Sequence, residues 1–197
     1  MTGCDSLPVV VVGDGGHALV VISSLNRLGV KIFGVTGEGK NEKGQILNVP
    51  IIGNDDEINK WGPDEIRLVN GIGMPVPGFS QRHACAERFR ALGYRFLAVV
   101  DPTAVISPDV IISEGVQIMA GAVVQPGVSI GLDAIVNTGA RIDHDCFIGD
   151  GSHICPGATL AGSVKIGEQS LVGSGATIIP NVRVSERSLV RAGSLMS

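Results

Sequence analysis

The second half of the chain repeats a pattern of six residues, and this repeat limits the possible folds more than any other feature. Written in sixes from Ala104, the sequence gives fifteen hexads that end at Gly193. The third residue is aliphatic in every hexad, and the first is always Ala, Val, Cys or Ser. Proline occupies the fifth position four times. Such regularity predicts a stack of identical short elements.

The spacing within each hexad predicts a flat-sided coil. Residues one and three lie two apart, so they point to the same side of a strand and fill an interior, while residue two points outward. Residues five and six turn a corner, where proline restrains φ and glycine or asparagine accepts a positive φ. Three such sides close one coil of a triangular prism. Residues 104–193 therefore predict five coils of an all-β parallel β-helix.

The first half follows a different pattern, in which short apolar runs alternate with longer amphipathic stretches. We predict strands at residues 8–12, 31–35 and 67–70 and helices at 17–28 and 81–92, each helix followed by a glycine. This order predicts a small parallel α/β layer. We place a Rossmann-like α/β domain at residues 1–100 and the β-helix domain at residues 101–197.

The composition argues against several classes of protein. A formal net charge of −4 and the lack of any Lys or Arg run argue against a nucleic-acid or membrane-surface partner. No apolar stretch reaches about 18 residues, and the N-terminus lacks the basic segment of a signal peptide. The cysteines Cys4, Cys85, Cys146 and Cys155 form no CxxC pair. We expect a cytoplasmic protein with free thiols and no metal site.

His144 and Asp145 are candidates for chemistry because of their places in the repeat. His144 stands at a fifth position, a corner elsewhere given to proline, so its imidazole is expected to project from an edge of the prism. Asp145 follows it, and a carboxylate beside an imidazole raises its basicity and fixes its tautomer. Sixth positions usually hold turn residues, so a purely structural role for Asp145 in the turn stays open as an alternative. Asp143 is a competing neighbour.

The hexad positions also sort the other histidine and the cysteines of this half. His153 is a second-position residue, so it faces outward toward another subunit, a ligand or water. Cys146 is a first-position residue and should pack inside. Cys155 stands at a fourth position. A catalytic cysteine needs an activating base, so we expect neither to be a nucleophile.

A glycine-rich turn follows the first predicted strand and opens the first helix. This turn, Gly13-Asp14-Gly15-Gly16-His17, offers backbone N–H groups and a helix N-terminus to a phosphate. The GxGxxG pattern is incomplete, and the second strand ends at Val35-Thr36 without the acid that would hold an NAD ribose. A nucleotide-linked substrate therefore fits better than a dinucleotide cofactor, and a turn without any ligand stays an alternative.

These segments together resemble the nucleotide-sugar N-acetyltransferases of the bacillosamine and perosamine pathways, a family grouped with the sialic acid O-acetyltransferases. The resemblance rests on the turn ending in His17, on Gly71-Ile72-Gly73, on Asp101-Pro102-Thr103-Ala104, and on Asn137-Thr138-Gly139-Ala140 ahead of Asp143-His144-Asp145. It implies a left-handed β-helix, a homotrimer, acetyl-CoA as co-substrate and a nucleotide-linked amino sugar as acceptor.

The same resemblance implies roles for single residues in a direct acetyl transfer to the 4-amino group of the sugar. His144 would be the general base, tuned by Asp145. The residues implied to contact acetyl-CoA are His153, Gly162, Ser174 and Ala192. Those implied to contact the nucleotide sugar are Gly13, Asp14, Gly15, Gly73 and Asn137.

Three alternatives stay open at this stage. The nucleotide can be UDP, GDP or dTDP. The acceptor can instead be a hydroxyl of sialic acid or another sugar, because the same His-Asp pair would serve. The protein can also be a non-catalytic nucleotide-sugar binder, which is favoured only by the end of the chain at Ser197 without a Val-Pro-Ala-Lys type tail.

Outward apolar residues agree with the implied trimer. Second positions hold Ile111, Val123, Ile135, Phe147 and Leu171, which would give the prism apolar outer faces. Because a prism with flat sides has no deep cleft of its own, we expect the active site to lie between subunits.

Overall fold

The chain divides into two compact units, residues 1–97 (unit 1) and 98–197 (unit 2). The computed structural model describes residues 7–38, 44–74 and 80–197, so Cys4 lies outside the described residues. Within those ranges, no helix is long and apolar enough to cross a bilayer.

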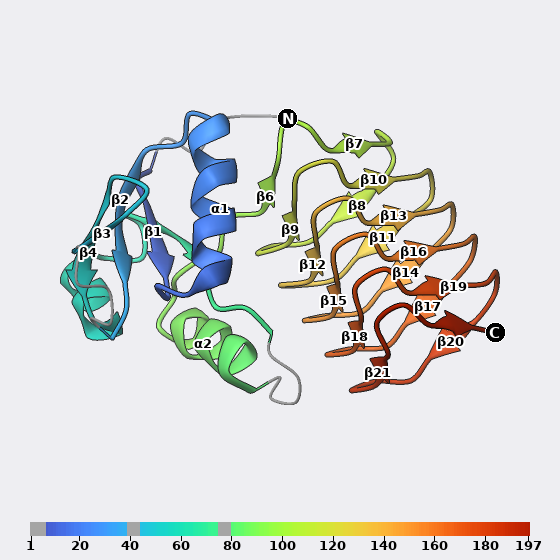
Figure 1. The fold of residues 1–197 in the computed structure, drawn as a ribbon. Helices are drawn as coiled ribbons and strands as arrows, with labels where there is room; N and C mark the ends of the chain where they lie inside the picture. The colour runs from blue at the N-terminus through green and yellow to red at the C-terminus, as the bar shows by residue number, and fades with distance from the viewer. Residues whose placement is uncertain (1–6, 39–43, 75–79) are drawn as a thin grey trace. The chain divides into compact units, whose positions relative to one another are not determined.

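Unit 1 is built on a five-stranded sheet (Figure 1). Its strands are β1 (Val9–Val12), β2 (Ile32–Thr36), β3 (Gln45–Ile46), β4 (Val49–Gly53) and β5 (Arg67–Asn70), in the order β3-β4-β2-β1-β5. β1 pairs in parallel with β2 and β5, and β2 pairs in parallel with β4. The predicted α/β layer is therefore confirmed. The prediction missed β3, β4 and the following 3₁₀-helix η1 (Asp55–Lys60), and it was wrong in making the layer wholly parallel, because β3 is antiparallel to β4.

Two helices flank this sheet. α1 (Gly16–Arg27) buries Ala18, Val21, Ile22 and Leu25, whose spacing of three and four residues places them on one helix face. α2 (Ser80–Ala91) contributes Phe89 to a core that includes Val10, Val12 and Leu68. The chain runs from β1 to β2 on one side of β1, and β5 lies on the other side. The carboxyl end of β1 is thus a topological switch point, where open α/β sheets bind ligands.

Unit 2 is a left-handed parallel β-helix whose coils are stacked side by side (Figure 1). Paired residues lie one coil of eighteen residues apart, as in Val123↔Arg141 and Ile135↔His153. The strands form three sheets, which we name by one member each: the β13 sheet (β22-β19-β16-β13-β10-β7), the β14 sheet (β20-β17-β14-β11-β8) and the β15 sheet (β21-β18-β15-β12-β9-β6).

Each strand of unit 2 covers two residues, which are the second and third positions of a hexad. The repeat continues one strand beyond the predicted hexads at each end, as β6 and β22. The strands are β6 (Val99–Val100), β7 (Val105–Ile106), β8 (Ile111–Ile112), β9 (Gln117–Ile118), β10 (Val123–Val124), β11 (Ser129–Ile130), β12 (Ile135–Val136), β13 (Arg141–Ile142), β14 (Phe147–Ile148), β15 (His153–Ile154), β16 (Thr159–Leu160), β17 (Lys165–Ile166), β18 (Leu171–Val172), β19 (Thr177–Ile178), β20 (Arg183–Val184), β21 (Leu189–Val190) and β22 (Leu195–Met196).

The interior and the corners follow the hexad positions. Third-position residues pack in one core with small first-position residues, among them Cys146. A serine at the first position keeps its hydroxyl bonded inside the coil, because Ser152 Oγ donates to the Gly167 carbonyl at 2.8 Å. Every sixth position except Asp109 has a positive φ, between 53° and 74°. The corner prediction is therefore confirmed.

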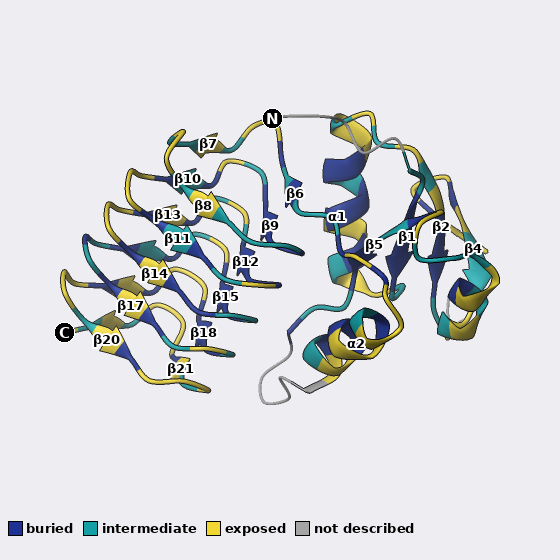
Figure 2. Ribbon diagram, turned by 180° about the vertical axis from the view of Figure 1, so that it is seen from behind, coloured by how far each residue is buried: buried dark blue, intermediate teal, exposed yellow. Residues whose placement is uncertain are grey.

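The outward positions differ between sheets. Ile111 and Phe147 on the β14 sheet are 66% and 46% exposed, and both strands carry exposed residues in Figure 2. Ile135 and Leu171 on the β15 sheet are only 0% and 4% exposed. Ile111 and Phe147 therefore offer apolar surface on the β14 sheet, as the sequence predicted.

Candidate active site

The corner that joins β13 to β14 carries the predicted base. Three features hold its backbone: the Asp145 N–H donates to the Pro126 carbonyl at 3.0 Å, the Ser163 N–H donates to the His144 carbonyl at 2.8 Å, and the His144 N–H donates to Asp143 Oδ1 at 2.8 Å. Asp145 has a φ of 58°, a conformation that Asp tolerates better than most residues. The corner is therefore tied to the coils before and after it.

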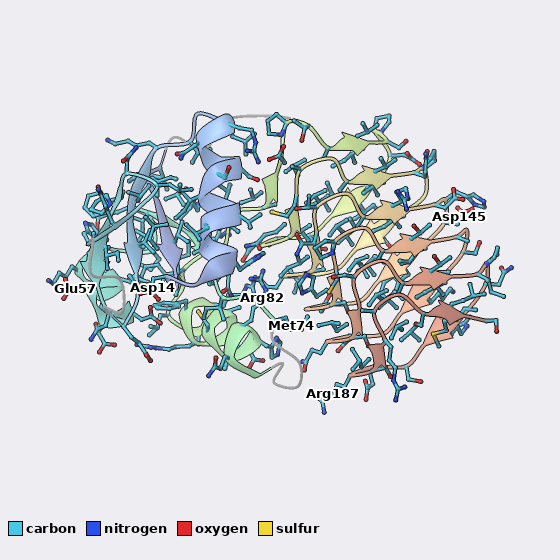
Figure 3. All side chains as sticks on the ribbon, in the orientation of Figure 1. Asp14, Glu57, Met74, Arg82, Asp145 and Arg187 are labelled. Carbon is cyan, nitrogen blue, oxygen red and sulfur yellow. The ribbon has the colours of Figure 1, made fainter. Side chains whose placement is uncertain are left out.

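The imidazole of His144 is oriented by the next residue. His144 Nδ1 lies 2.8 Å from Asp145 Oδ2, and both side chains are more than half exposed. Figure 3 labels Asp145 at this outer edge of unit 2. With the proton on Nδ1 donated to the carboxylate, Nε2 carries a lone pair that can accept a proton. This arrangement suits a general base.

Glycines of the two neighbouring coils make room for the pair. A Cβ on Gly162 would lie 2.6 Å from both Cε1 and Nε2 of His144, so the ring lies directly over this glycine. A Cβ on Gly127, one coil earlier, would lie 2.5 Å from Asp145 Oδ1. Gly162 was predicted from the resemblance as a coenzyme contact. The structure adds that its lack of a side chain is what lets the imidazole occupy this place.

Electrostatics make His144 more basic than an ordinary histidine. The hydrogen bond to Asp145 is the main reason that the pKa of His144 is raised above 6.5. Partial desolvation opposes this shift, and the charges of Asp143 and Asp145 add to it. Both carboxylates considered in the sequence thus act on the imidazole, with Asp145 as the direct partner.

Asn137 and His153 form a second pair on another side of the prism. Asn137 Nδ2 lies 2.9 Å from His153 Nε2, and His153 is only 8% exposed. His153 belongs to the β15 sheet, which is the side opposite the corner between β13 and β14. Because its side chain points outward from that side, it faces away from His144 of the same chain.

Ser174 and Ala192 lie on a third part of unit 2. Both are fifth-position residues on the corner between the β15 and β13 sheets, one coil apart. The neighbouring glycines Gly175 and Gly193 have open space where a Cβ would point. The predicted coenzyme and base residues thus fall into three groups that a single β-helix does not bring together.

The cysteines Cys146 and Cys155 are not placed to act as nucleophiles. Cys146 is buried in the prism, and its Sγ donates to the Ala161 carbonyl at 3.2 Å. Burial raises the pKa of Cys155 to about 11, so its thiol stays protonated. Among the described residues, no three His, Cys, Asp or Glu side chains are grouped to hold a metal ion.

Unit 1 has a cleft of about 1000 Å³ at the carboxyl ends of its parallel strands. Gly13, Asp14 and Gly15 line it from the end of β1, and Gly73 lines it from the segment after β5. The cleft therefore brings four of the predicted substrate residues together. Asn137, the fifth, lies in unit 2 and is not among the described residues that line this cleft.

Sequence reasoning missed several lining residues of this cleft. They follow β2 and β4 or lie on α2, and they are Gly37, Glu38, Asn54, Asp55, Asp56, Gln81, Ala84, Cys85 and Arg88. One signal was present in the sequence, because the run Ile51-Ile52-Gly53 ends in Asn54-Asp55-Asp56, an apolar strand followed by a capping residue. Asn54 caps η1 by accepting the Asp56 N–H at 3.0 Å.

A β-helix of hexads with a His-Asp pair on one corner defines the class of hexapeptide-repeat acyltransferases. Residues 145–180 match the family described as bacterial transferase hexapeptide (six repeats), and residues 8–89 match the PglD N-terminal domain. No curated protein matches the chain significantly.

Solved structures define the family more closely. PerB from Caulobacter crescentus, in complex with CoA and GDP-perosamine, is 35% identical with a TM-score of 0.88, covering 96% of this chain and 88% of that chain. A perosamine N-acetyltransferase variant from the same organism, with a histidine replaced by asparagine, is 34% identical with a TM-score of 0.87 and the same coverage. The acetyltransferase domain of PglB from Neisseria gonorrhoeae, in complex with acetyl coenzyme A, is 33% identical with a TM-score of 0.85, covering 94% and 88%. The chain belongs to this family of sugar N-acetyltransferases.

Proposed function

We propose that the protein transfers the acetyl group of acetyl-CoA to the 4-amino group of a nucleotide-linked amino sugar. One observation carries the proposal: His144 is hydrogen-bonded to Asp145 and lies over Gly162 on a corner of the β-helix. The chain that carries this corner is 35% identical to PerB, which was solved with CoA and GDP-perosamine. The cleft of unit 1 supplies a second element, a site for a nucleotide at a switch point with a helix N-terminus.

The transfer is direct and needs no acyl-enzyme. The sugar amine attacks the thioester carbonyl carbon, a C–N bond forms, and His144 Nε2 takes the amine proton. The tetrahedral intermediate collapses with cleavage of the C–S bond, and the imidazolium returns the proton to the leaving thiolate of CoA. The backbone N–H of Gly162 stabilises the negative oxygen of the intermediate. Asp145 holds the proton on Nδ1, so that Nε2 both takes the amine proton and returns it to the thiolate.

The coenzyme follows small residues along the prism. Ser174 and Ala192 lie one coil apart on one corner. The neighbouring Gly175 and Gly193 have no side chains that project from this corner. Such a surface suits an extended pantetheine chain. His153, held by Asn137, contacts the thioester end. Gly13, Asp14, Gly15 and Gly73 hold the nucleotide sugar in the cleft of unit 1.

The active site is completed by a second copy of the chain in a homotrimer. His144 and His153 point away from each other in one β-helix, so a site that uses both takes them from two copies. The β14 sheet adjoins the His144 corner and exposes Ile111 and Phe147, which supply an apolar contact surface. We place the enzyme in the cytoplasm, which supplies acetyl-CoA and keeps thiols such as Cys146 reduced.

The proposal is tested by an acetylation screen. Purified protein is incubated with acetyl-CoA and UDP-, GDP- or dTDP-linked 4-amino sugars, and release of CoA and the product mass are measured. One of these amines should be acetylated, and His144→Ala should lower kcat by about 10²–10⁴-fold.

His83→Ala is the matched control, because His83 is an α2 residue paired with Glu87 at 3.2 Å. It should keep normal activity. Transfer to a hydroxyl but to none of the amines, or a His144→Ala variant within threefold of wild type, would contradict the proposal.

A further inference from the structure

The cleft of unit 1 has an unusual charge for a site that takes an anionic nucleotide. Four carboxylates line its described part, from Asp14, Glu38, Asp55 and Asp56, against the single guanidinium of Arg88. Carboxylates repel phosphate oxygens, so the diphosphate does not lie against Glu38, Asp55 and Asp56, which form the acidic end of the cleft. The diphosphate instead lies at the start of α1, where N-cap Gly15, next to Asp14, presents the first N–H groups of the helix.

Two carboxylates stand over the end of β2. Thr36 Oγ1 donates to Asp55 Oδ1 at 2.6 Å, which fixes the Asp55 carboxylate against the last residue of the strand. The Asp14 carboxyl carbon lies 2.2 Å from where a Gly37 Cβ would be, so Asp14 covers the next residue. Figure 3 labels Asp14 in this part of unit 1.

Asp14 is incompletely satisfied without a ligand. Its Oδ2 is buried and has no hydrogen-bond partner among the described residues. A buried oxygen without a partner is unfavourable, and a donor on a ligand would offset this loss. Since an ionised carboxylate only accepts hydrogen bonds, this end of the cleft calls for a ligand group rich in N–H and O–H donors.

Arg88 adds donors beside these acceptors. Its Nη2 lies 2.7 Å from Asp56 Oδ1, an ion pair that joins η1 to α2. A guanidinium has five N–H donors, so this bond leaves others for the ligand. The acidic end thus presents carboxylate acceptors next to guanidinium donors.

We propose, resting on the proposed function, that the nucleotide is guanosine diphosphate and that this acidic end reads the guanine base. Asp55 accepts the adjacent N1–H and N2–H donors of guanine, and Arg88 donates to its O6 and N7 acceptors, a pairing common between arginine and guanine. Asp14 accepts from the ribose hydroxyls. Uracil and thymine present one N–H between two carbonyl oxygens, so a carboxylate there meets acceptor lone pairs.

Calorimetry on the whole protein tests the base without catalysis. The probes are GDP, IDP, UDP and dTDP, where IDP lacks only the N2 amino group of GDP. We expect GDP to bind roughly tenfold or more tighter than UDP and dTDP, with IDP weaker than GDP. Binding of UDP or dTDP as tight as that of GDP overturns the inference while leaving acetyl transfer to a nucleotide sugar intact. If none of the four binds, the nucleotide site of the proposed function fails as well.

The variant Asp55→Asn tests the proposed contact with guanine directly. Thr36 can still donate to the amide oxygen, so the amide nitrogen then faces the guanine donors. GDP affinity should fall roughly tenfold with no loss for UDP, whereas Asp64→Asn, an exposed carboxylate that is not in the cleft lining, should change neither. An unchanged GDP preference in Asp55→Asn contradicts the assignment. The thermal unfolding midpoints of both variants show that the fold is retained.

Discussion

At the scale of residues, the position of the His144 imidazole depends on two neighbours in different coils. Asp145 holds Nδ1 from the same corner, and Gly162 leaves the space that the ring occupies. The hexad position of His144 predicted its place on an edge. The spacing alone did not predict the contact with Gly162, because contacts across the corner depend on side-chain direction as well as on the repeat.

Gly162→Ala tests this contact. The backbone at Gly162 is not in the left-handed region, so alanine fits the chain, but its Cβ would lie 2.6 Å from the imidazole. The ring must move by about 1 Å, which can cost about 10²-fold in rate. We expect kcat to fall by about that factor, with an unchanged thermal unfolding midpoint.

A double mutant provides the control for Gly162→Ala. If the glycine acts by placing the imidazole, Gly162→Ala should cause no further loss in the His144→Ala background. A second loss of full size would mean that Gly162 acts independently of His144.

Asp145→Asn tests the electrostatic role of the carboxylate. Asn also accepts a positive φ, so the corner is kept. Because Asp145 raises the pKa of His144, the wild-type rate falls as the pH drops through that raised pKa and the base becomes protonated. In Asp145→Asn, this acidic limb of the kcat/KM profile should move to lower pH, and the maximal rate should fall. A limb at an unchanged or higher pH would show that Asp145 has only a turn function.

At the scale of elements, the two units differ in how far the sequence predicted them. The β-helix was predicted nearly strand by strand, because each side contains a fixed arrangement of one inward aliphatic and one small residue. β3 and β4 were missed because β3 has two residues and β4 contains Pro50, so neither shows a clear alternation. Asp55 and Asp56 were missed with them, since both come after β4 and the capping residue Asn54.

Ile148→Ala tests the interior of the coil. Ile148 is fully buried at a third position, and such a truncation costs about 2–5 kcal/mol. Denaturant unfolding should show this loss of stability. Lys165→Ala is the control, because Lys165 is an exposed second-position residue paired with Phe147 in the neighbouring strand. An Ile148→Ala protein as stable as the control would contradict the packing of the prism.

At the scale of the whole molecule, the account depends on two copies sharing one site. His144 stands on one edge of the β-helix, and His153 points outward from the side opposite that edge. The sequence predicted a site between subunits from the flat sides of the prism. It did not separate His144 from His153, which the three sheets place on an edge and on the side opposite that edge.

Subunit complementation tests this central claim most directly. His144→Ala and His153→Ala chains should each have strongly reduced activity alone, and each is mixed with the other by joint refolding or co-expression in equal amounts. If His144 and His153 of one site come from different copies, random assortment should restore acetyl transfer to about a quarter of the wild-type rate. Activity of the mixture no higher than the mean of the two variants alone would contradict a site shared between copies.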